Sequence, residues 1–513
     1  GRGFISYVEL GINQLGAVYE GLMSYSGSFA AERLWEVAPG GDASKGSWVV
    51  PEDVMKGLEE KDFVTVEDEV TGERRNVTYE KGQFVYRLSG RDRQRSASFY
   101  TPEVLTRFTV QQALAELLDQ DGRTTSAEEI LHLTVCEPAL GSGAFAIEAV
   151  RQLAEQYLSR RERELGRRVD PEERPRELAK VKAFIALHQV YGVDLNATAV
   201  ELAEVSLWLD TMVEGLAAPW FGLRLRRGNS LVGARRALYS TSQLKKRAWL
   251  SAAPVPEPLS QVAAVLDDAD AASRHRIGGA LDVSGSIHHF LLPAKGWGSA
   301  VEVREKVPDL VDTERLEALQ TWREEITQVL STNQALRLTA LARRVEVLWE
   351  MTLRRLRVAE GEASRRIDLW GREAQDNAGS TVSREEIEEY LAAPGSAYRR
   401  LRLVMDAWCA LWFWPLTTDA TPPSLDEWLG ALEGLLGKQV KDAKGTDGTL
   451  VDASSWAELE TMEEVELGLA GARKVQSVVD EHEWLTVVQK VAEAQGFFHW
   501  ELDFATVFAR GGF

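Results

Sequence analysis

Residues 136–145 have the sequence "CEPALGSGAF", and they follow the apolar run "ILHLTV" of residues 130–135. A glycine-rich turn between a buried strand and a helix lets the backbone approach a ligand closely, because glycine carries no side chain. The helix that follows presents unpaired N–H groups at the same place. The stretch therefore predicts a strand over 131–136, a ligand-binding loop, and a helix from Ala144 to about Arg161. The alternative is a simple tight turn in which Glu137 is a solvated acid.

Two more strands are expected downstream. The short apolar run "VYGVDL" occupies residues 190–195, and "GLRLRRGNSLVG" at residues 222–233 predicts a third strand that ends in a polar turn. Helical periodicity in "ATAVELAEVSLWLDTM", residues 197–212, separates these strands, and the charged segment before them contains another helix. Strands that alternate with helices indicate an α/β fold with a parallel sheet.

The exits of these strands carry polar side chains that a nucleotide-like cofactor needs. An acid at the end of the second strand can hold both ribose hydroxyls, and Asp194 stands there; Asn229, after the third strand, can reach an adenine amino group. A phosphate loop with G-K-[ST] is absent, which disfavours a P-loop nucleotidase. The dinucleotide fingerprint is incomplete, because Ala146 replaces its third glycine and Asp194 lies much farther along the chain than the usual roughly 20 residues.

Composition limits the classes of protein. The chain has 513 residues, too many for one ordinary domain, and its 44% hydrophobic content and 16 Trp indicate well-packed cores. The net charge of −20 disfavours non-specific nucleic-acid binding except at local basic patches. Cys136 and Cys409 provide no disulfide framework and no zinc ligand set, which favours a reducing, cytoplasmic location. No apolar stretch is long enough to span a bilayer, so we expect no membrane partner.

The N-terminal part mixes two kinds of pattern. Apolar spacing predicts helix in residues 1–36, and the alternating stretch at 63–88 predicts β-hairpin structure. The tripeptide Thr101-Pro102-Glu103 is typical of a helix start, with Thr101 as the N-cap and a helix that extends to about Leu118.

Residues 237–495 are charged and mostly helical in pattern. One long amphipathic run covers 313–366, and further helices are expected to begin near Ser383 and Ser424. The apolar stretch 407–416 predicts a buried helix end stopped by Pro415. We therefore expect a helical and hairpin region at 1–90, an α/β core at 91–236, a helical insert at 237–495 and a return segment at 496–513.

Four motifs now resemble those of one enzyme family. "SASFYTPEVLTRF" (96–108), "CEPALGSGAFAIEAV" (136–150), "VYGVDLNATAVELAEVSLWL" (190–209) and "RRGNSLVG" (226–233) resemble motifs X, I, II and III of the gamma-class N6-adenine DNA methyltransferases, in that class's order. "GINQLGAVYEGLMSY" (11–25) and "IHHFLLPAKGWG" (287–298) look most like the adenine methyltransferase of DISARM phage-defence systems, with the BREX methyltransferase second. The resemblance implies a Rossmann-like class I methyltransferase core with an incomplete parallel sheet and a large, mainly α-helical insert.

The resemblance also implies a site for S-adenosyl-L-methionine. Residues 100–102 would line the methionine end of the cofactor, Asp194 would take the ribose hydroxyls, Leu195 would pack on the adenine ring, and Asn229 would bind the adenine amine. Arg91, Arg93 and Arg95 lead into that pocket and are candidate DNA phosphate contacts. The cofactor residues so implied are Tyr100, Thr101, Pro102, Glu137, Ala139, Gly141, Ser142, Gly143, Asp194, Leu195 and Asn229.

The family's catalytic motif N-P-P-[YFW] does not occur in the sequence, although "FHWELDFATVFARGGF" (498–513) resembles the stretch just before it. The resemblance thus implies the cofactor-binding part of a site-specific DNA adenine-N6 methyltransferase from a phage-defence or restriction-modification system. We expect it to be catalytically incomplete alone, without a catalytic residue or a metal site of its own. Double-stranded DNA, bound through the complete protein, and other defence subunits are the implied partners. The alternatives are a non-catalytic cofactor-binding or scaffold subunit and a methyltransferase of another substrate.

Several other residues invite functional interpretations that we set aside. His288-His289 lacks a third metal ligand at suitable spacing, and His499-Trp500 lies in an aromatic run, so we expect both pairs to be structural. The tryptophans at 408, 412 and 414 precede Pro415 in an apolar helix and are expected in a core. The arginine tracts at 224–236 and 399–402 are expected to be solvated faces.

Overall fold

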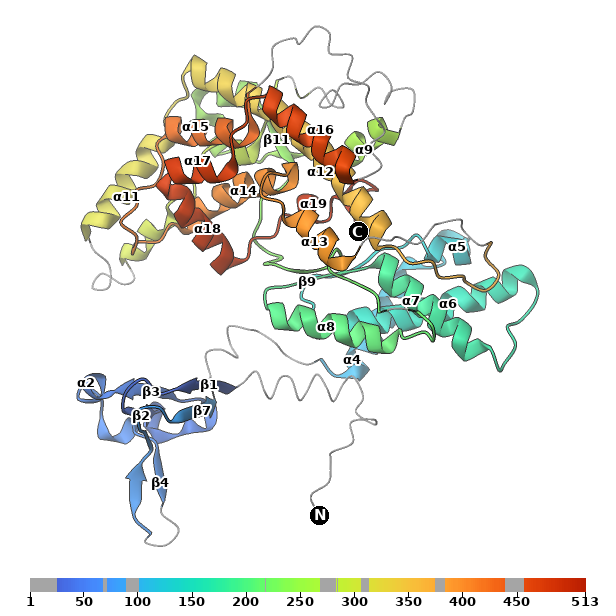
Figure 1. Cartoon of the computed structure of the whole chain (residues 1–513), viewed down its shortest axis with the longest axis horizontal. Helices are drawn as coiled ribbons and strands as arrows, with labels where there is room; N and C mark the ends of the chain where they lie inside the picture. The colour runs from blue at the N-terminus through green and yellow to red at the C-terminus, as the bar shows by residue number, and fades with distance from the viewer. Residues whose placement is uncertain are drawn as a thin grey trace.

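A computed structural model describes residues 25–67, 72–88, 101–216, 218–267, 283, 285–305, 313–373, 383–438 and 456–513. These residues form an N-terminal antiparallel β unit, a parallel sheet with its helices, and a helical domain (Figure 1). The mixed α/β class expected from the sequence is confirmed. Within the described ranges, no helix has both the length and the hydrophobicity needed to cross a bilayer.

The N-terminal unit is built from short antiparallel strands. Strand β1 (Tyr25–Phe29) pairs with β7 (Phe84–Leu88), and β2 (Leu34–Val37) lies between β3 (Trp48–Pro51) and β6 (Thr78–Tyr79). Strand β4 (Thr65–Glu67) forms the expected hairpin with β5 (Arg74–Asn76). The helical elements of this unit are the short η1 (Pro39–Gly41), η2 (Ala43–Lys45), α2 (Glu52–Met55) and η3 (Glu60–Asp62).

The helix predicted for residues 1–36 is wrong over its described part. Residues 25–29 are strand β1, and residues 34–37 are strand β2. The sequence "YSGSF" contains serine and glycine, which are poor helix formers, and it pairs in register with β7 along its whole length. Residues 1–24 lie outside the described residues.

The parallel sheet is the element that positions the candidate site. Strands β8 (Val135–Glu137), β9 (Val190–Asp194) and β10 (Leu225–Arg227) are all parallel, in the order β10-β9-β8. The connections contain α6 (Ala144–Leu165), α7 (Arg174–Gln189) and α8 (Ala197–Asp210), so the predicted alternation of strands and helices is confirmed. All three strands therefore end at one edge of the sheet, where the connecting loops meet.

Two boundaries before this sheet differ from the prediction. Helix α4 (Glu103–Leu117) is confirmed, but Pro102 rather than Thr101 takes its N-cap position, without a side-chain capping bond. The first parallel strand begins at Val135 instead of residue 131, because Ser126 and Glu129 form a capping box that starts the short helix α5 (Ala127–Ile130). The turn η4 (Gln120–Gly122) lies between these helices.

The two faces of the sheet are covered by different parts of the chain. Val190 of β9 faces a core shared with α6, α7 and α8, whose largest members include Tyr157 and Ile185. Tyr191 and Val193 point to the opposite face, because successive side chains of a strand alternate. The C-terminal segment covers that second face, with Phe498, Phe504 and Val507 buried against the strand residues.

The helical domain begins with a small antiparallel sheet, β12 (Val255–Pro256), β11 (Ala237–Ser240) and β13 (Ser286–His288). Helix α12 (Thr332–Ala363) runs through the centre of the helical domain (Figure 1), and residues on most sides of this helix are buried. Around it lie α9 (Ser260–Asp267), α11 (Thr313–Ile326), α13 (Arg384–Ala392), α14 (Ala397–Ala410), α15 (Leu425–Leu436), α16 (Trp456–Leu469), α17 (Val475–Glu481) and α18 (Glu483–Gln495). The 3-10 segments are η5 (Thr241–Leu250), η6 (His289–Leu291), η7 (Ser299–Glu305) and η8 (Leu411–Phe413).

Helix starts in this domain were partly predictable. Ser383 and Ser424 are N-caps with capping boxes, as expected. The single long helix predicted for 313–366 is wrong, because the chain breaks between α11 and α12. A third capping box, formed by Ser331 and Gln334, starts α12. Helix α14 ends at Ala410 and continues as η8 before Pro415, so the predicted buried helix end is confirmed.

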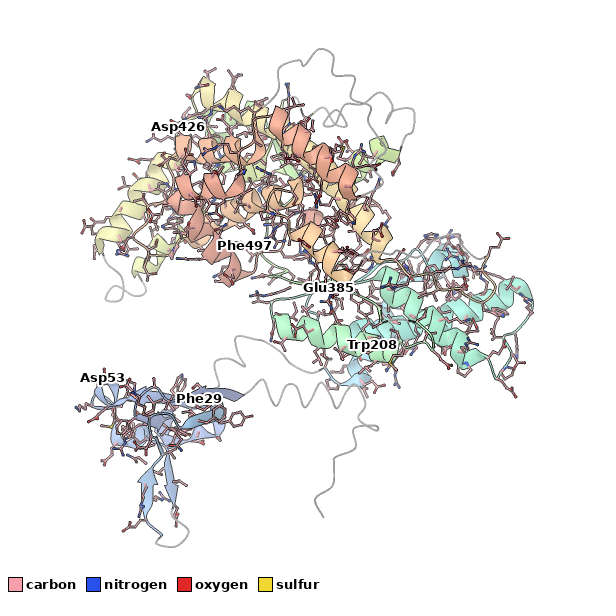
Figure 2. The ribbon with its side chains drawn as sticks, in the orientation of Figure 1. Phe29, Asp53, Trp208, Glu385, Asp426 and Phe497 are labelled. Atoms are coloured by element: carbon pink, nitrogen blue, oxygen red, sulfur yellow. The ribbon has the colours of Figure 1, made fainter. Side chains whose placement is uncertain are left out.

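The chain leaves the parallel sheet after β10 and returns to it at the end of the helical domain. Phe497 forms a parallel bridge with Asn229, and the N–H of Phe498 donates to the carbonyl of Val232 at 2.9 Å. The return segment continues as α19 (Trp500–Asp503) and α20 (Ala505–Phe508). Figure 2 shows Phe497 on the side of the helical domain that faces the parallel sheet.

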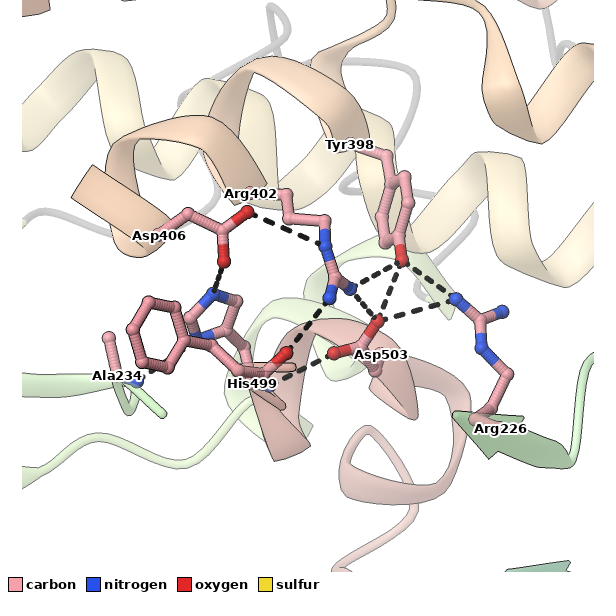
Figure 3. Close-up of polar contacts among 8 residues, drawn as sticks. Arg226, Ala234, Tyr398, Arg402, Asp406, His499 and Asp503 are labelled. Atoms are coloured by element: carbon pink, nitrogen blue, oxygen red, sulfur yellow. Dashed lines mark hydrogen bonds and ion pairs between the residues drawn. The ribbon is translucent and has the colours of Figure 1, made fainter. Parts of the chain in front are cut away.

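A buried carboxylate joins the return segment to both neighbours. Asp503 accepts hydrogen bonds from Tyr398 at 2.7 Å and from Arg402 at 2.5 Å, both on α14, and pairs with Arg226 of β10 at 3.4 Å (Figure 3). Burial alone would raise the pKa of Asp503, but the charges of Arg402 and Arg226 outweigh it and hold the pKa below its usual value. Removal of one partner from such a buried set leaves the others unpaired, which costs about 3–5 kcal/mol.

We predict opposite effects on stability for two glycine substitutions. A Cβ at Gly233 would lie 1.8 Å from the backbone carbonyl oxygen of Phe498, so Gly233→Ala should push the return segment away and lower the free energy of unfolding by about 1–3 kcal/mol. Gly430 lies inside α15 with no atom within 4 Å of its Cβ position, so Gly430→Ala should raise it by about 0.5–1 kcal/mol. Thermal melting of both variants is the measurement, and a Gly233→Ala protein that melts at or above the wild type would contradict the described junction.

Candidate functional site

The glycine loop of residues 138–143 lies over the neighbouring strand. The N–H of Leu140 donates to the carbonyl of Val193 at 2.9 Å, and the Leu140 side chain is buried against Gly192 of β9. Gly141 and Gly143 have positive φ values of 53° and 78°, a conformation that glycine adopts without strain. A Cβ at Gly143 would also approach Ala203 of α8 to 3.3 Å. The loop therefore needs glycine both for its backbone angles and for close packing.

Asp194 connects the exits of all three strands. Its Oδ2 accepts a hydrogen bond from the N–H of Gly141 at 2.8 Å, which fixes the glycine loop after β8. Its Oδ1 accepts from the N–H of Asn196 at 2.9 Å, and its backbone carbonyl accepts from Gly228, after β10, at 2.8 Å. The side chain remains half-exposed, so its oxygens can still accept bonds from a ligand at this edge.

Glu137, the last residue of β8, is buried behind the loop. Its Oε2 accepts a hydrogen bond from the N–H of Ala146 at 2.9 Å, so the carboxyl group satisfies one of the free N–H groups at the N-terminus of α6. Burial raises the pKa of Glu137 to about 8, with a further contribution from Asp194; the N–H groups of Ala146 and Phe145 act in the opposite direction. Glu137 is therefore not the solvated acid of a simple turn.

Leu195 and Asn229 complete the edge on its other side. Leu195 is an exposed apolar side chain, 43% accessible, between two polar residues. The N–H of Asn229 donates to the carbonyl of Gly496 at 2.5 Å, while its side-chain Oδ1 accepts from the N–H of Leu231 at 3.1 Å. A Cβ at Gly496 would lie 2.9 Å from Leu195, so the return segment passes directly beside this residue.

The structure thus brings most of the predicted cofactor residues to one edge. Gly141, Ser142 and Asp194 are half-buried there, Ala139 is exposed, and Gly143 is buried beneath them. Thr101 and Pro102 precede α4, whose Arg107 carbonyl accepts a bond from Gln152 of α6. Among the described residues, no hydrogen bond joins these two to the glycine loop. Tyr100 and the arginines at 91, 93 and 95 lie outside the described residues.

Other polar candidates have structural roles. His288 is buried and contacts Glu346 at 2.8 Å, and His289 contacts the carbonyl of Arg235 at 3.0 Å. His499 is fully buried; its Nδ1 accepts from the N–H of Ala234, so its Nε2 donates to Asp406 at 3.1 Å (Figure 3). The described part of the chain contains no group of three or more His, Cys, Asp or Glu residues that could hold a metal ion. The tryptophans at 408, 412 and 414 pack on the core of the helical domain.

Three residues of this edge were missed by sequence reasoning. The side chain of Leu140, in the loop, packs over Gly192 of β9, which has no side chain of its own. A glycine within the apolar sequence of β9 is the feature from which this close packing could have been predicted. Gly496 is the left-handed residue that ends α18, and a glycine after a long helical pattern is a recognisable stop. Its position beside Leu195 could not be predicted, because it depends on how the return segment docks.

Comparison with known proteins matches the part of the chain that builds this edge. Residues 118–216, which include the glycine loop and Asp194, match the family described as MmeI, DNA-methyltransferase domain. A curated protein of Methanocaldococcus jannaschii, assigned as a type II restriction enzyme and methyltransferase, is 31% identical over 143 residues. That match covers 23% of this chain and 11% of that protein. No solved structure matches the chain significantly. Residues 118–216 are thus similar to a DNA-methyltransferase domain, and the chain matches only a small part of the length of the curated relative.

We predict that Glu137 makes the stability of the protein depend on pH. The raised pKa keeps a proton on this carboxyl in the folded protein up to a pH of about 8, whereas the unfolded chain loses it near the ordinary glutamate pKa of 4.5. The free energy of unfolding should therefore fall as pH rises through that interval, by up to about 5 kcal/mol from this group. Glu137→Gln keeps the acceptor for Ala146 and should remove this fall.

Urea denaturation at a series of pH values measures the effect. Glu137→Gln should be more stable than the wild type at the alkaline end of the series and similar to it at the acidic end. Glu116→Gln, at an exposed position of α4, is the matched control and should reproduce the wild-type profile. Parallel profiles for the wild type and Glu137→Gln would show that this carboxyl does not carry the proton.

Proposed function

We propose that this chain is the S-adenosylmethionine-binding part of a site-specific DNA adenine-N6 methyltransferase in a phage-defence or restriction-modification system. One observation carries the proposal: Asp194 is the half-exposed acid at which the exits of three parallel strands meet. Such an edge, where loops from parallel strands converge, is the common site for nucleotide-like ligands in α/β proteins. The DNA-methyltransferase match over residues 118–216 includes this acid and supports the proposal.

The side chains at this edge suit the chemistry of the methyl donor. Asp194 would accept hydrogen bonds from the ribose hydroxyls, and the exposed face of Leu195 would pack against the adenine ring. The side-chain oxygen of Asn229 would accept a hydrogen bond from the adenine amine. The backbone of residues 139–143 would lie along the cofactor in what we propose to be a Rossmann-like core, with Tyr100 to Pro102 at the methionine end. Bound S-adenosylmethionine supplies an electrophilic methyl group.

The target base and the wider system rest on the motifs. The order of the four motifs, with the "SASFYTPEVLTRF" stretch first, supports adenine-N6 specificity and the defence-type assignment. The exocyclic amine of adenine is a weak nucleophile, and enzymes position such a base outside the duplex before transfer. In the family that the motifs resemble, the N-P-P-[YFW] motif, which does not occur in this sequence, serves that step. We propose double-stranded DNA as the substrate.

Calorimetric titration with S-adenosylmethionine tests the site. We predict binding by the wild type and a loss of about 10- to 100-fold in affinity for Asp194→Ala, because charge-assisted hydrogen bonds contribute about 1.5–3 kcal/mol each. Asp194→Asn keeps one acceptor oxygen, for Gly141, but removes the charge and the acceptor for Asn196, so it should bind with intermediate affinity.

Asp170→Ala provides a matched control. Asp170 accepts the same kind of bond from a backbone N–H two residues ahead, that of Glu172 at 2.9 Å, but it lies in an exposed turn before α7. Its loss should leave the affinity unchanged. Equal affinities of the wild type and a folded Asp194→Ala protein would refute the role of Asp194, and a wild type that binds no methyl donor would favour a scaffold subunit.

A further inference from the structure

Most arginines of the two basic tracts are structural. In the tract around β10 and the tract on α14, five guanidinium groups are committed to internal partners. These are Arg224 with Leu187 and Tyr191, Arg226 with Tyr398 and Asp503, Arg236 with Glu346, Arg400 with Gly395 and Leu435, and Arg402 with Asp503 and Phe497. The expectation that both tracts are solvated faces is therefore wrong for these five residues, because their guanidinium groups bond to groups inside the structure. Arg226 and Arg402 share Asp503 at the junction between the sheet and the helical domain.

Two of the remaining arginines meet in one groove. Arg227 ends β10 and Arg399 lies near the start of α14, far apart in the sequence, yet both line a groove of about 580 Å³. Its wall is completed by Gln476, Gln489 and Gly496 of the α17–α18 region. The volume falls within the range of about 300–1,000 Å³ that is usual for ligand sites. The groove is thus large enough for part of a substrate and is open to solvent.

The guanidinium groups of this groove are available for an anion. Arg399 is exposed, and its side chain makes no hydrogen bond or ion pair with any described residue; Arg227 is exposed and makes one long bond, 3.4 Å, to the carbonyl of Leu195. Other arginines of the helical domain have carboxylate partners at close range, such as Arg337 with Glu433 at 2.7 Å. In a chain with a net charge of −20, two arginines that pair with no carboxylate of the described residues and share one groove are a specific local feature.

The acids of the groove do not cancel these two charges. Asp406 lies in the wall, but it is already engaged by His499 and by Arg402. Arg402 is in turn held by Asp503. Glu493 is the remaining acid in the groove lining, and it is exposed. The described part of the groove therefore carries two available positive charges against one exposed negative charge.

The groove adjoins the candidate cofactor edge. Arg227 is two residues before Asn229, and Gly496 lies in the groove wall while its carbonyl accepts the bond from the N–H of Asn229. A group bound in the groove would thus lie beside the part of the candidate edge that we assign to the cofactor adenine. Arginine is well suited to phosphate, since its planar fork donates several hydrogen bonds and always carries charge.

We infer that the groove between β10, α14 and α18 binds a backbone phosphate of the nucleic-acid substrate, with Arg227 and Arg399 as its ligands. The identity of the ligand as DNA rests on the proposed function. The helical domain then contributes directly to substrate binding, because Arg399 lies on α14. The contact positions the nucleic acid and carries no sequence information, as is usual for phosphate contacts.

Fluorescence anisotropy with a labelled mixed-sequence DNA duplex tests this inference. The full chain is titrated at several salt concentrations between about 50 and 200 mM, where phosphate contacts dominate the salt dependence of affinity. The double variant Arg227→Gln, Arg399→Gln should bind several-fold more weakly, and the slope of log Kobs against log salt should decrease in magnitude by about 1, because one phosphate contact is lost. Glu493→Gln should bind more tightly, because it removes the groove's exposed negative charge.

Two controls separate this inference from the proposed function. Arg384→Gln removes an arginine of α13 that is paired with Glu388, and it should leave DNA affinity unchanged. Titration with S-adenosylmethionine should give the same affinity for the wild type and the double variant. DNA affinity that is equal in the wild type and the double variant, or a wild type that binds no duplex, overturns the phosphate site. A wild type that binds no S-adenosylmethionine, but whose DNA affinity still depends on Arg227 and Arg399, would overturn only the proposed function.

Discussion

The carboxylate of Asp194 is the interaction on which the candidate site depends. It holds the glycine loop through the N–H of Gly141, while the carbonyl of the same residue holds the chain after β10 through Gly228. Three strand exits that belong to separate βα units therefore share one acceptor residue. Without this residue the loop after β8 would keep its contact through Leu140 but lose the bond at its tip. The cofactor site that we propose at this edge would be built mainly from backbone groups, and Asp194 would set their geometry.

The opposite face of the sheet explains why the helical domain belongs to the same structure. The return segment covers Tyr191 and Val193 with aromatic residues, and the N–H of Phe498 bonds to Val232. Asp503 then links the segment to α14 and β10 through buried charges. Buried ion pairs are poor sources of net stability, but they penalise any docking that leaves a charge unpaired. This network therefore favours one orientation of α14, and Arg399 on that helix then lies near Arg227.

Sequence reasoning predicted the local elements better than their docking. The glycine loop, the strand that ends at Asp194 and the helix starts at Ser383 and Ser424 follow from short-range chemistry, and the structure has them. The N-terminal helix prediction failed for residues 25–36, because strand pairing with later parts of the chain decided the conformation there: β1 pairs with β7, and β2 pairs with β3 and β6. The long helix over 313–366 failed because the capping box at Ser331 was overlooked.

In the candidate site too, local features were predicted better than the contacts that depend on docking. Asp194, Leu195 and Asn229 were predicted from motifs, and the structure places them on one edge. Whether each arginine is exposed or bonded to an internal partner could not be predicted, because a solvated arginine and one paired with a buried acid look alike in sequence. Arg226 and Arg227 are adjacent, yet one is committed to Asp503 and the other lines an open groove. Only the docking of α14 and the return segment distinguishes them.

Hydrogen–deuterium exchange of the wild-type chain with and without S-adenosylhomocysteine tests the central claim most directly. The account predicts slower exchange in peptides that cover residues 138–143, 194–196 and 228–231, because the ligand would cover these N–H groups at one edge. Peptides from α11 and α15, which lie away from that edge, should exchange at unchanged rates. Unchanged exchange in all three loops, or protection confined to other segments, would contradict a cofactor site at the carboxyl edge of the parallel sheet.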